Sequence, residues 1–146
     1  IPAADKKLMK VLVKSFHASN LPVIIEENSM REFLSISELS IVTSGTASLE
    51  SAVLGCSPII CYKTNFINYS IISRMLKVDN IGLPNLLLND RYFVELLQND
   101  FNKQNIKNAI KDTLLLKENS ENIAISLKEM LKGRGYSDAA RELTLI

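Results

Sequence analysis

The residue types best suited to binding a phosphate lie in one short segment, Thr43-Ser44-Gly45-Thr46-Ala47. An apolar run precedes this segment, and small or apolar residues at helical spacing follow it, so it is predicted to join a strand to a helix. Gly45 lets the backbone turn sharply and come close to a ligand. The free amides of Thr46, Ala47 and Ser48 would then point out of the helix start and attract phosphate.

Glu50 lies one helical turn after Thr46, on the same side of the predicted helix. Its carboxylate would repel a phosphate, but it could accept two hydrogen bonds from a ribose diol held just beyond. The hydroxyls of Ser44 and Thr46 could add hydrogen bonds to the phosphate. The alternative interpretation is a capped helix start with a surface glutamate, because short phosphate-loop patterns often arise by chance.

A second candidate segment follows the predicted strand at 81–83 and would lie at the same edge of the sheet. There Asn85 offers both a donor and an acceptor; alternatively it caps the helix that follows. Lys63, at the end of the preceding strand, could meet an anion or could be a solvated charge.

Short apolar strands alternate with helices up to about residue 100, and this pattern is typical of a parallel sheet covered on both faces. Helices are predicted near the start of the chain, from Ser29 as a capping box, after Thr46, at 66–76 and at 91–97. The strands are predicted at 23–25, 39–42, 59–62 and 81–83. Because the chain opens with a helix, the first strand or strands of such a sheet are expected to be missing.

Helices alone are predicted beyond residue 100, capped by Asn102, Ser120 and Ser137. We therefore expect a partial Rossmann-like domain over 1–100 and a carboxyl-terminal helical segment over 101–146. The helix at 66–76 is open to two interpretations: it covers the sheet, or it meets lipid head groups at a membrane surface.

Composition excludes several classes of protein. The chain has 146 residues, and 17 basic against 16 acidic residues leave a net charge of +1, which argues against a nucleic-acid-binding protein. Cys56, Cys61 and the single His17 indicate neither a disulfide framework nor a metal site, and the cysteines are interpreted as buried apolar residues. No apolar run approaches the roughly 18 to 20 residues that span a bilayer, and the start is unlike a signal peptide. We expect a soluble cytoplasmic domain from a longer protein.

Five segments, in this order and spacing, together resemble the lipid-A-disaccharide synthase family. The resemblance covers about residues 39–98, with a weaker helical match to the end. The first segment alone occurs loosely among nucleotide-sugar transferases and epimerases, whereas the combination is more specific. The segments are Ser44–Glu50, Leu54–Pro58, Tyr62-Lys63, Leu83–Leu87 and Glu95–Gln98.

The resemblance implies the carboxyl-terminal half of a B-type glycosyltransferase fold, which has two Rossmann-like domains facing a cleft and uses no metal or cofactor. The family transfers 2,3-diacylglucosamine from its UDP adduct to 2,3-diacylglucosamine 1-phosphate with inversion, giving lipid A disaccharide and UDP. The alternatives are another UDP-sugar transferase, a 2-epimerase, or a non-catalytic α/β interaction module.

The resemblance also implies which residues bind substrate. The diphosphate would be held by Ser44, Gly45, Thr46 and Ala47, the ribose by Glu50, and the nucleotide or donor sugar by Asn85, with Gln98 a weaker candidate. Such enzymes are hexosyltransferases peripheral to the inner membrane, and some form homodimers that exchange carboxyl-terminal helices. Since the catalytic base would lie on an absent amino-terminal domain, the chain alone is expected to be inactive.

Overall fold

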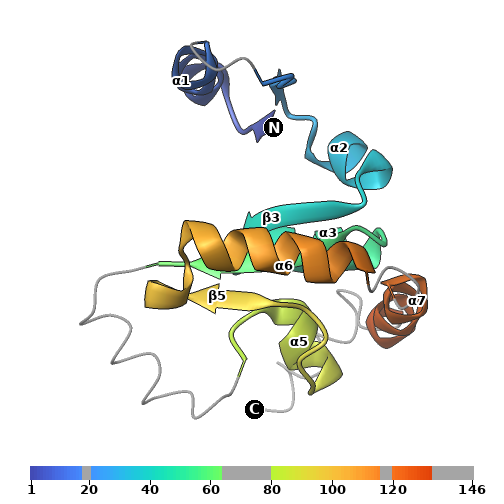
Figure 1. Ribbon diagram of the computed structural model, residues 1–146. Coiled ribbons are helices and arrows are strands. Elements are labelled where there is room, and N and C mark those ends of the chain that lie inside the picture. Colours follow the sequence, from blue (N-terminus) through green and yellow to red (C-terminus); the bar gives the residue numbers. More distant parts are fainter. Residues whose placement is uncertain (18–20, 64–79, 116–119, 133–146) are drawn as a thin grey trace, which may run out of the picture. The chain divides into compact units, whose positions relative to one another are not determined.

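The computed structural model describes residues 1–17, 21–63, 80–115 and 120–132 (Figure 1). The chain divides into two compact units, Ile1–Ser37 and Glu38–Ile146. Each unit contains parallel strands and helices. The helix predicted at 66–76 and the one predicted to begin at Ser137 lie outside the described residues.

The first unit opens with a strand, not with the predicted helix. Pro2 and Ala3 pair in parallel with a second short strand. The first helix starts after them, where the Asp5 carboxylate accepts a hydrogen bond from the Leu8 amide over 2.7 Å and so caps the helix. That second strand begins at Glu26, later than predicted, because it is the amides of Glu26 and Asn28 that donate to the carbonyl oxygens of Ile1 and Ala3. The elements are β1 (Pro2–Ala3), α1 (Lys6–Phe16), β2 (Glu26–Glu27) and α2 (Met30–Ile36).

Helix α2 begins directly after Ser29, as the sequence predicts, but its capping box is absent. The Ser29 side chain makes no capping hydrogen bond; its hydroxyl donates instead to the carbonyl oxygen of Glu26 over 3.2 Å. The spacing therefore located the helix correctly and its mechanism of capping incorrectly.

The second unit is built on a three-stranded parallel sheet in the order β3-β4-β5. Ile41 lies opposite Ile59, and Cys61 lies opposite Leu96. Helices follow or connect these strands in the manner of a Rossmann-like fold. The elements are β3 (Leu39–Thr43), α3 (Thr46–Val53), β4 (Ser57–Tyr62), α5 (Leu83–Leu88), β5 (Glu95–Leu97), the 3-10 helix η1 (Gln98–Asp100), α6 (Lys103–Leu115) and α7 (Ser120–Leu131).

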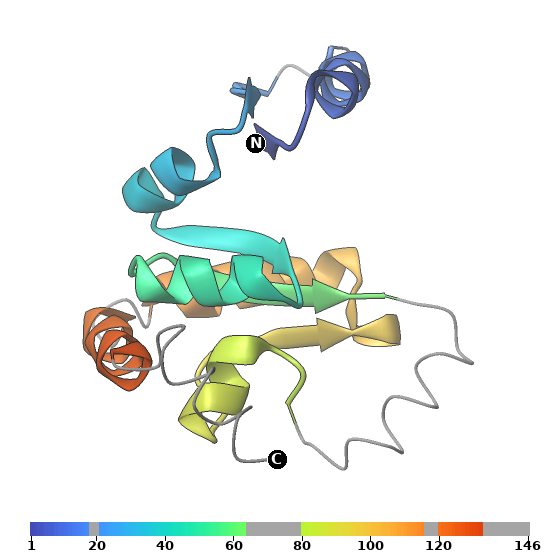
Figure 2. The same cartoon turned by 180° about the vertical axis from the view of Figure 1, so that it is seen from behind.

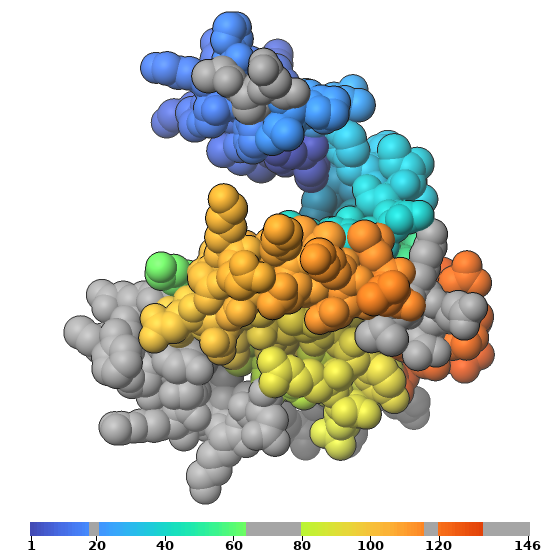
Figure 3. Space-filling view, in the orientation of Figure 1, coloured from blue at the N-terminus to red at the C-terminus, as the bar shows by residue number. Residues whose placement is uncertain are grey.

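Both faces of the sheet are covered, because successive side chains of β4 point to opposite faces. Ile60 packs with Ala52 of α3 and Leu127 of α7, whereas Ile59 and Cys61 pack against α6. Helix α6 lies on one face of the sheet and α3 on the other (Figures 1 and 2). In the space-filling view the side chains of α6, in orange, cover much of the near face (Figure 3). The predicted α/β class with a parallel sheet is confirmed.

The assignment of residues 81–97 was wrong in two places. The segment predicted as a strand leads into α5, which begins at Leu83 and has Pro84 in its first turn, where the missing amide costs nothing. The segment predicted as a helix contains β5, because its backbone pairs with β4: the Ile60 amide donates to the carbonyl oxygen of Val94 over 2.8 Å. Pairing with a distant strand overrides the local helical pattern.

The start of α6 was predicted correctly. The Asn102 side chain accepts a hydrogen bond from the Asn105 amide over 3.0 Å and caps α6. At the end of α3, Gly55 has a φ of 83°, and the amides of Gly55 and Cys56 donate back to the carbonyl oxygens of Ala52 and Ser51.

Helices α6 and α7 contribute to the two cores of the sheet. The boundary predicted at residue 100 stays a prediction.

Candidate functional site

The turn between β3 and α3 has the sharp geometry that the sequence predicts. Gly45 has a φ of 138° and a ψ of −160°, a conformation that residues with a Cβ rarely adopt. No described atom lies within 4 Å of a Cβ placed on it. Glycine is therefore needed here for the backbone conformation, and the space beside the turn is open.

The amides at the start of α3 are largely available to a ligand. Within the described part of the chain, no group accepts a hydrogen bond from the amides of Thr46 or Ala47. The prediction that the Ser48 amide is also free is wrong, because the Gly45 carbonyl oxygen lies within its reach: the Ser48 amide donates to that oxygen over 3.2 Å, and the Ser48 hydroxyl donates to it over 2.7 Å. The helix start thus offers two adjacent N–H groups beside an exposed Thr46 side chain.

The Ser44 hydroxyl is used within the protein. It donates to the carbonyl oxygen of Ile81 over 2.7 Å, across 37 positions of the chain. Its single proton is therefore not available to a phosphate in this structure. The contact instead joins the turn after β3 to the segment before α5, and so it brings together the two candidate segments that the sequence singled out.

Asn85 is buried and faces the interior. Its side chain is 0% exposed; its Nδ2 donates to the carbonyl oxygen of Phe93 and to Oε1 of Glu95, both over 2.8 Å, and its Oδ1 accepts from the Phe93 amide over 2.9 Å. Asn85 is the third residue of α5, so the capping alternative is wrong. Here its side chain holds the segment before β5.

Glu95, which belongs to the Glu95–Gln98 segment but is not predicted as a site residue, is the centre of this buried network. It is 3% exposed, its Oε2 accepts from the Ile81 amide over 2.9 Å, and its Oε1 accepts from the Gly82 amide over 3.0 Å as well as from Asn85. A buried carboxylate needs such donors. The signal that could have found it is a lone charge in the apolar run Val94-Glu95-Leu96-Leu97.

The approach of this backbone to Glu95 requires a glycine. A Cβ on Gly82 would lie 2.3 Å from Cδ1 of Ile60 and 3.0 Å from Oε1 of Glu95. Since Ile60 is fully buried, it has little room to move aside. The packing therefore holds the peptide between Ile81 and Gly82 in one place.

The remaining candidates lie on α3 and directly after two strands of the sheet. Glu50 is exposed on α3, one turn after Thr46. Gln98 follows β5 directly, and Lys63, which is exposed, follows β4; because Tyr62 pairs with Leu97, these two residues leave neighbouring strands side by side. The carboxyl edge of an open parallel sheet is where ligands bind in such folds.

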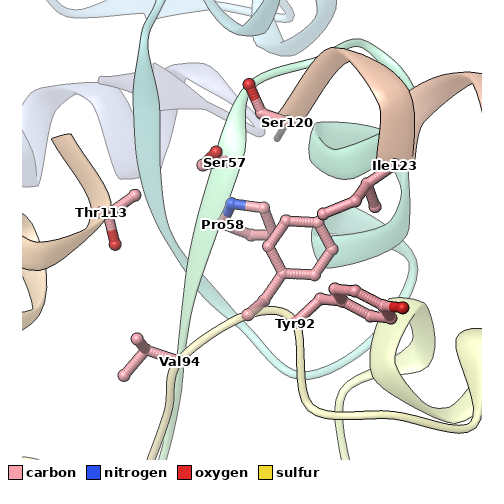
Figure 4. Close-up of a pocket in the computed structure, with 8 residues that line it drawn as sticks. Ser57, Pro58, Tyr92, Val94, Thr113, Ser120 and Ile123 are labelled. Atoms are coloured by element: carbon pink, nitrogen blue, oxygen red, sulfur yellow. The ribbon is translucent and has the colours of Figure 1, made fainter. Parts of the chain in front are cut away.

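A cavity of about 100 Å³ lies at the opposite end of the strands (Figure 4). Ser57 and Pro58 at the start of β4 form one wall, and Ile123 of α7 points toward them, whereas the Tyr92 hydroxyl points away from them. It contains none of the predicted site residues. The described residues that line it are Ser57, Pro58, Tyr92, Phe93, Val94, Thr113, Ser120 and Ile123.

The cysteines are buried, as predicted. Cys56 is 1% and Cys61 is 4% exposed, and both are free thiols. Burial raises the pKa of the Cys61 thiol, because desolvation disfavours the thiolate. In the described ranges, no three His, Cys, Asp or Glu side chains come close enough together to hold a metal ion.

Comparison with known proteins identifies a family for the chain. A model of the lipid-A-disaccharide synthetase family matches residues 1–142. The chain belongs to this family. The resemblance read from the sequence is confirmed, and it extends over the first unit as well as the sheet that carries Ser44.

Several lipid-A-disaccharide synthases are similar to the chain. The protein of Sulfurihydrogenibium sp. is 35% identical over 137 residues, which are 91% of this chain and 34% of that protein. The synthase of Wigglesworthia glossinidia brevipalpis is 34% identical over 71% of the chain and 28% of its own length. That of Alcanivorax borkumensis is 29% identical over 96% of the chain and 38% of its own length.

The chain thus spans about a third of the length of the lipid-A-disaccharide synthases that it matches. None of the helices in the described ranges is both long enough and apolar enough to pass through a bilayer.

Proposed function

We propose that this chain is the carboxyl-terminal, UDP-binding part of a lipid-A-disaccharide synthase. The whole protein would transfer 2,3-diacylglucosamine from its UDP adduct to 2,3-diacylglucosamine 1-phosphate, with inversion and release of UDP. One observation carries the proposal: in a chain of this family, the Gly45 turn leaves the amides of Thr46 and Ala47 without an acceptor among the described residues.

In the proposed complex these two amides bind the diphosphate. They lie at the positive end of the α3 dipole, and the open space beside Gly45 lets a phosphate oxygen approach the backbone. As the bond between sugar and UDP breaks, negative charge grows on the diphosphate and the fixed donors stabilise it. Loss of one such donor typically lowers the rate on the order of 10²- to 10³-fold.

The other candidates divide into direct and indirect roles in this proposal. Glu50, exposed one turn along α3, accepts hydrogen bonds from the ribose diol, and Gln98 contacts the donor sugar. Ser44 and Asn85 act by positioning, because their polar groups are already bonded within the protein: Ser44 to Ile81, and Asn85 to Phe93 and Glu95.

The remaining proposals follow from the family. The lipid acceptor and a peripheral position at the inner membrane belong to the whole enzyme, as does a homodimer that exchanges the helices after residue 100. The base that activates the acceptor would lie on another domain, so the chain alone would bind UDP without catalysing transfer.

Calorimetric titration of the chain with UDP tests the proposal. Saturable heat at or below millimolar UDP is expected, and Gly45→Ala should weaken it because alanine strains the turn. Gly55→Ala is the matched control, since Gly55 also has a positive φ and open space but lies at the far end of α3. Absence of heat and of any thermal shift at millimolar UDP would contradict the proposal and favour an interaction module.

The donor class needs the whole protein. An assay with acylated and unacylated UDP-glucosamine should show transfer from the acylated donor only. Epimerisation of the unacylated sugar would point instead to a 2-epimerase.

A further inference from the structure

We propose that Glu95 is a positioning residue for the phosphate-binding turn and that it acts through a single peptide group shared with Ser44. The inference rests on the proposed function in one respect, namely that the turn binds UDP. Glu95 itself would touch no ligand, because it is 3% exposed and begins β5, which is not adjacent to β3 in the sheet.

The shared group is the peptide between Ile81 and Gly82. Its N–H donates to Oε1 of Glu95 over 3.0 Å, and its carbonyl oxygen accepts from the Ser44 hydroxyl over 2.7 Å. Because a peptide group is planar, an N–H held in one direction sets the direction of the carbonyl. The carboxylate thus determines where the Ser44 hydroxyl finds its acceptor, and Ser44 directly precedes the Gly45 turn.

The segment has little freedom to relax away from this arrangement. The preceding amide, of Ile81, donates to Oε2 of Glu95 over 2.9 Å, so the carboxylate holds two successive amides. Asn85 holds Oε1 from the other side over 2.8 Å. Moving the segment would leave a buried carboxylate without donors, which is costly.

Hydrogen bonds on both sides of one peptide also strengthen each other. A carboxylate bound to the N–H polarises the group and makes its carbonyl oxygen a better acceptor. The contact between Ser44 and Ile81 should therefore depend on the charge of Glu95. A role confined to holding β5 in the sheet would not produce this dependence.

Glu95→Gln is the direct test. All three partners of the carboxylate are donors, so the new NH₂ group must face an N–H. Calorimetry should show that UDP binds on the order of tenfold more weakly to this variant and to Ser44→Ala, and that the double variant is little weaker than either single one. Ser44→Thr, which keeps a hydroxyl, should restore most of the affinity.

Ser51→Ala is the matched control for a general loss of stability. Its hydroxyl is buried in α3 and donates to the carbonyl oxygen of Cys56 over 2.6 Å, away from the turn. This variant should lose stability but keep the UDP affinity. Equal weakening by Ser51→Ala, or additive effects of the Glu95 and Ser44 variants, would overturn the inference while leaving UDP binding intact.

A readout without ligand separates this inference from the proposed function. In the NMR spectrum of the free chain, Ser44→Ala should shift the Gly82 amide resonance, and Glu95→Gln should shift those of Gly45 and Thr46. Unmoved resonances would overturn the inference even if UDP binds. If Glu95→Gln fails to fold, the Ser44 variants still test the link between Ser44 and the peptide of Ile81 and Gly82. The Gly82 amide resonance should shift in Ser44→Ala and recover in Ser44→Thr. Shifted resonances without any UDP binding would contradict the proposed function but not this inference.

Discussion

Asn85 and Phe93 exchange two hydrogen bonds, one from Nδ2 of Asn85 to the carbonyl oxygen of Phe93 over 2.8 Å and one from the Phe93 amide to Oδ1 over 2.9 Å. The side chain thereby satisfies both backbone groups of a residue that is 6% exposed. This pairing aligns the chain for its entry into β5 and leaves the second N–H of Asn85 for Glu95.

We expect Asn85→Ala to lower the free energy of unfolding by about 3 kcal/mol or more, because it leaves the N–H and C=O of Phe93 without partners and removes one donor from Glu95. Urea denaturation followed by circular dichroism measures this. Asn108→Ala is the control: Asn108 is exposed and its Oδ1 accepts from the exposed Gln104 side chain, so the change should cost under about 0.5 kcal/mol. Similar losses in the two variants would contradict the role of Asn85.

Gly82→Ala should destabilise the chain by about 1 to 3 kcal/mol, because the new Cβ collides with Cδ1 of Ile60. Ile60→Val removes that atom and by itself should cost about 0.5 to 1.5 kcal/mol. The double variant should therefore be less destabilised than the sum of the two single variants, as measured by urea denaturation. Additive losses would show that the collision is relieved in another way.

Glu50 should discriminate UDP from 2′-deoxy-UDP. If its carboxylate accepts hydrogen bonds from the ribose diol, the chain should bind UDP on the order of tenfold more tightly than the deoxy compound, and Glu50→Ala should abolish that preference. Titration calorimetry with both nucleotides gives the four affinities. Glu121→Ala, an exposed change in the first turn of α7, should keep the preference; loss of it there, or its persistence in Glu50→Ala, would exclude the ribose role.

Cys61 should make stability decline at alkaline pH. Burial raises the pKa of its thiol above the ordinary 9.0, so the folded state holds the proton more tightly than the unfolded state. The stability that the protonated thiol contributes to the folded state is fully present below about pH 9, and it is lost as pH rises through the higher pKa of the folded state. Denaturation from pH 7.5 to 10 should show a steeper fall for the natural chain than for Cys61→Ala, and parallel curves would contradict the assignment.

Local signals in the sequence were sufficient for the turn at the candidate site and for its neighbours. Gly45 must adopt a conformation that suits glycine, the runs in β3 and β4 are apolar, and the small residues after Thr46 fit a helix that packs closely. Each of these features depends on residues within one turn or one strand. The α/β class followed from such local patterns, and the family resemblance followed from the order and spacing of five short segments between Ser44 and Gln98.

Tertiary structure alone decided what residues 81–97 do. Residues 91–97 are predicted as a helix, but Glu95–Leu97 form a strand because β4 offers a partner, and local patterns carry no information about that distant backbone. For the same reason the sequence assigns no role to the Glu95 side chain, because only folding brings the amides of Ile81 and Gly82 to it. Asn85 likewise reads as a ligand contact or a helix cap until its partners at Phe93 and Glu95 are known, because hydrogen-bond partners far apart in the chain are set by packing.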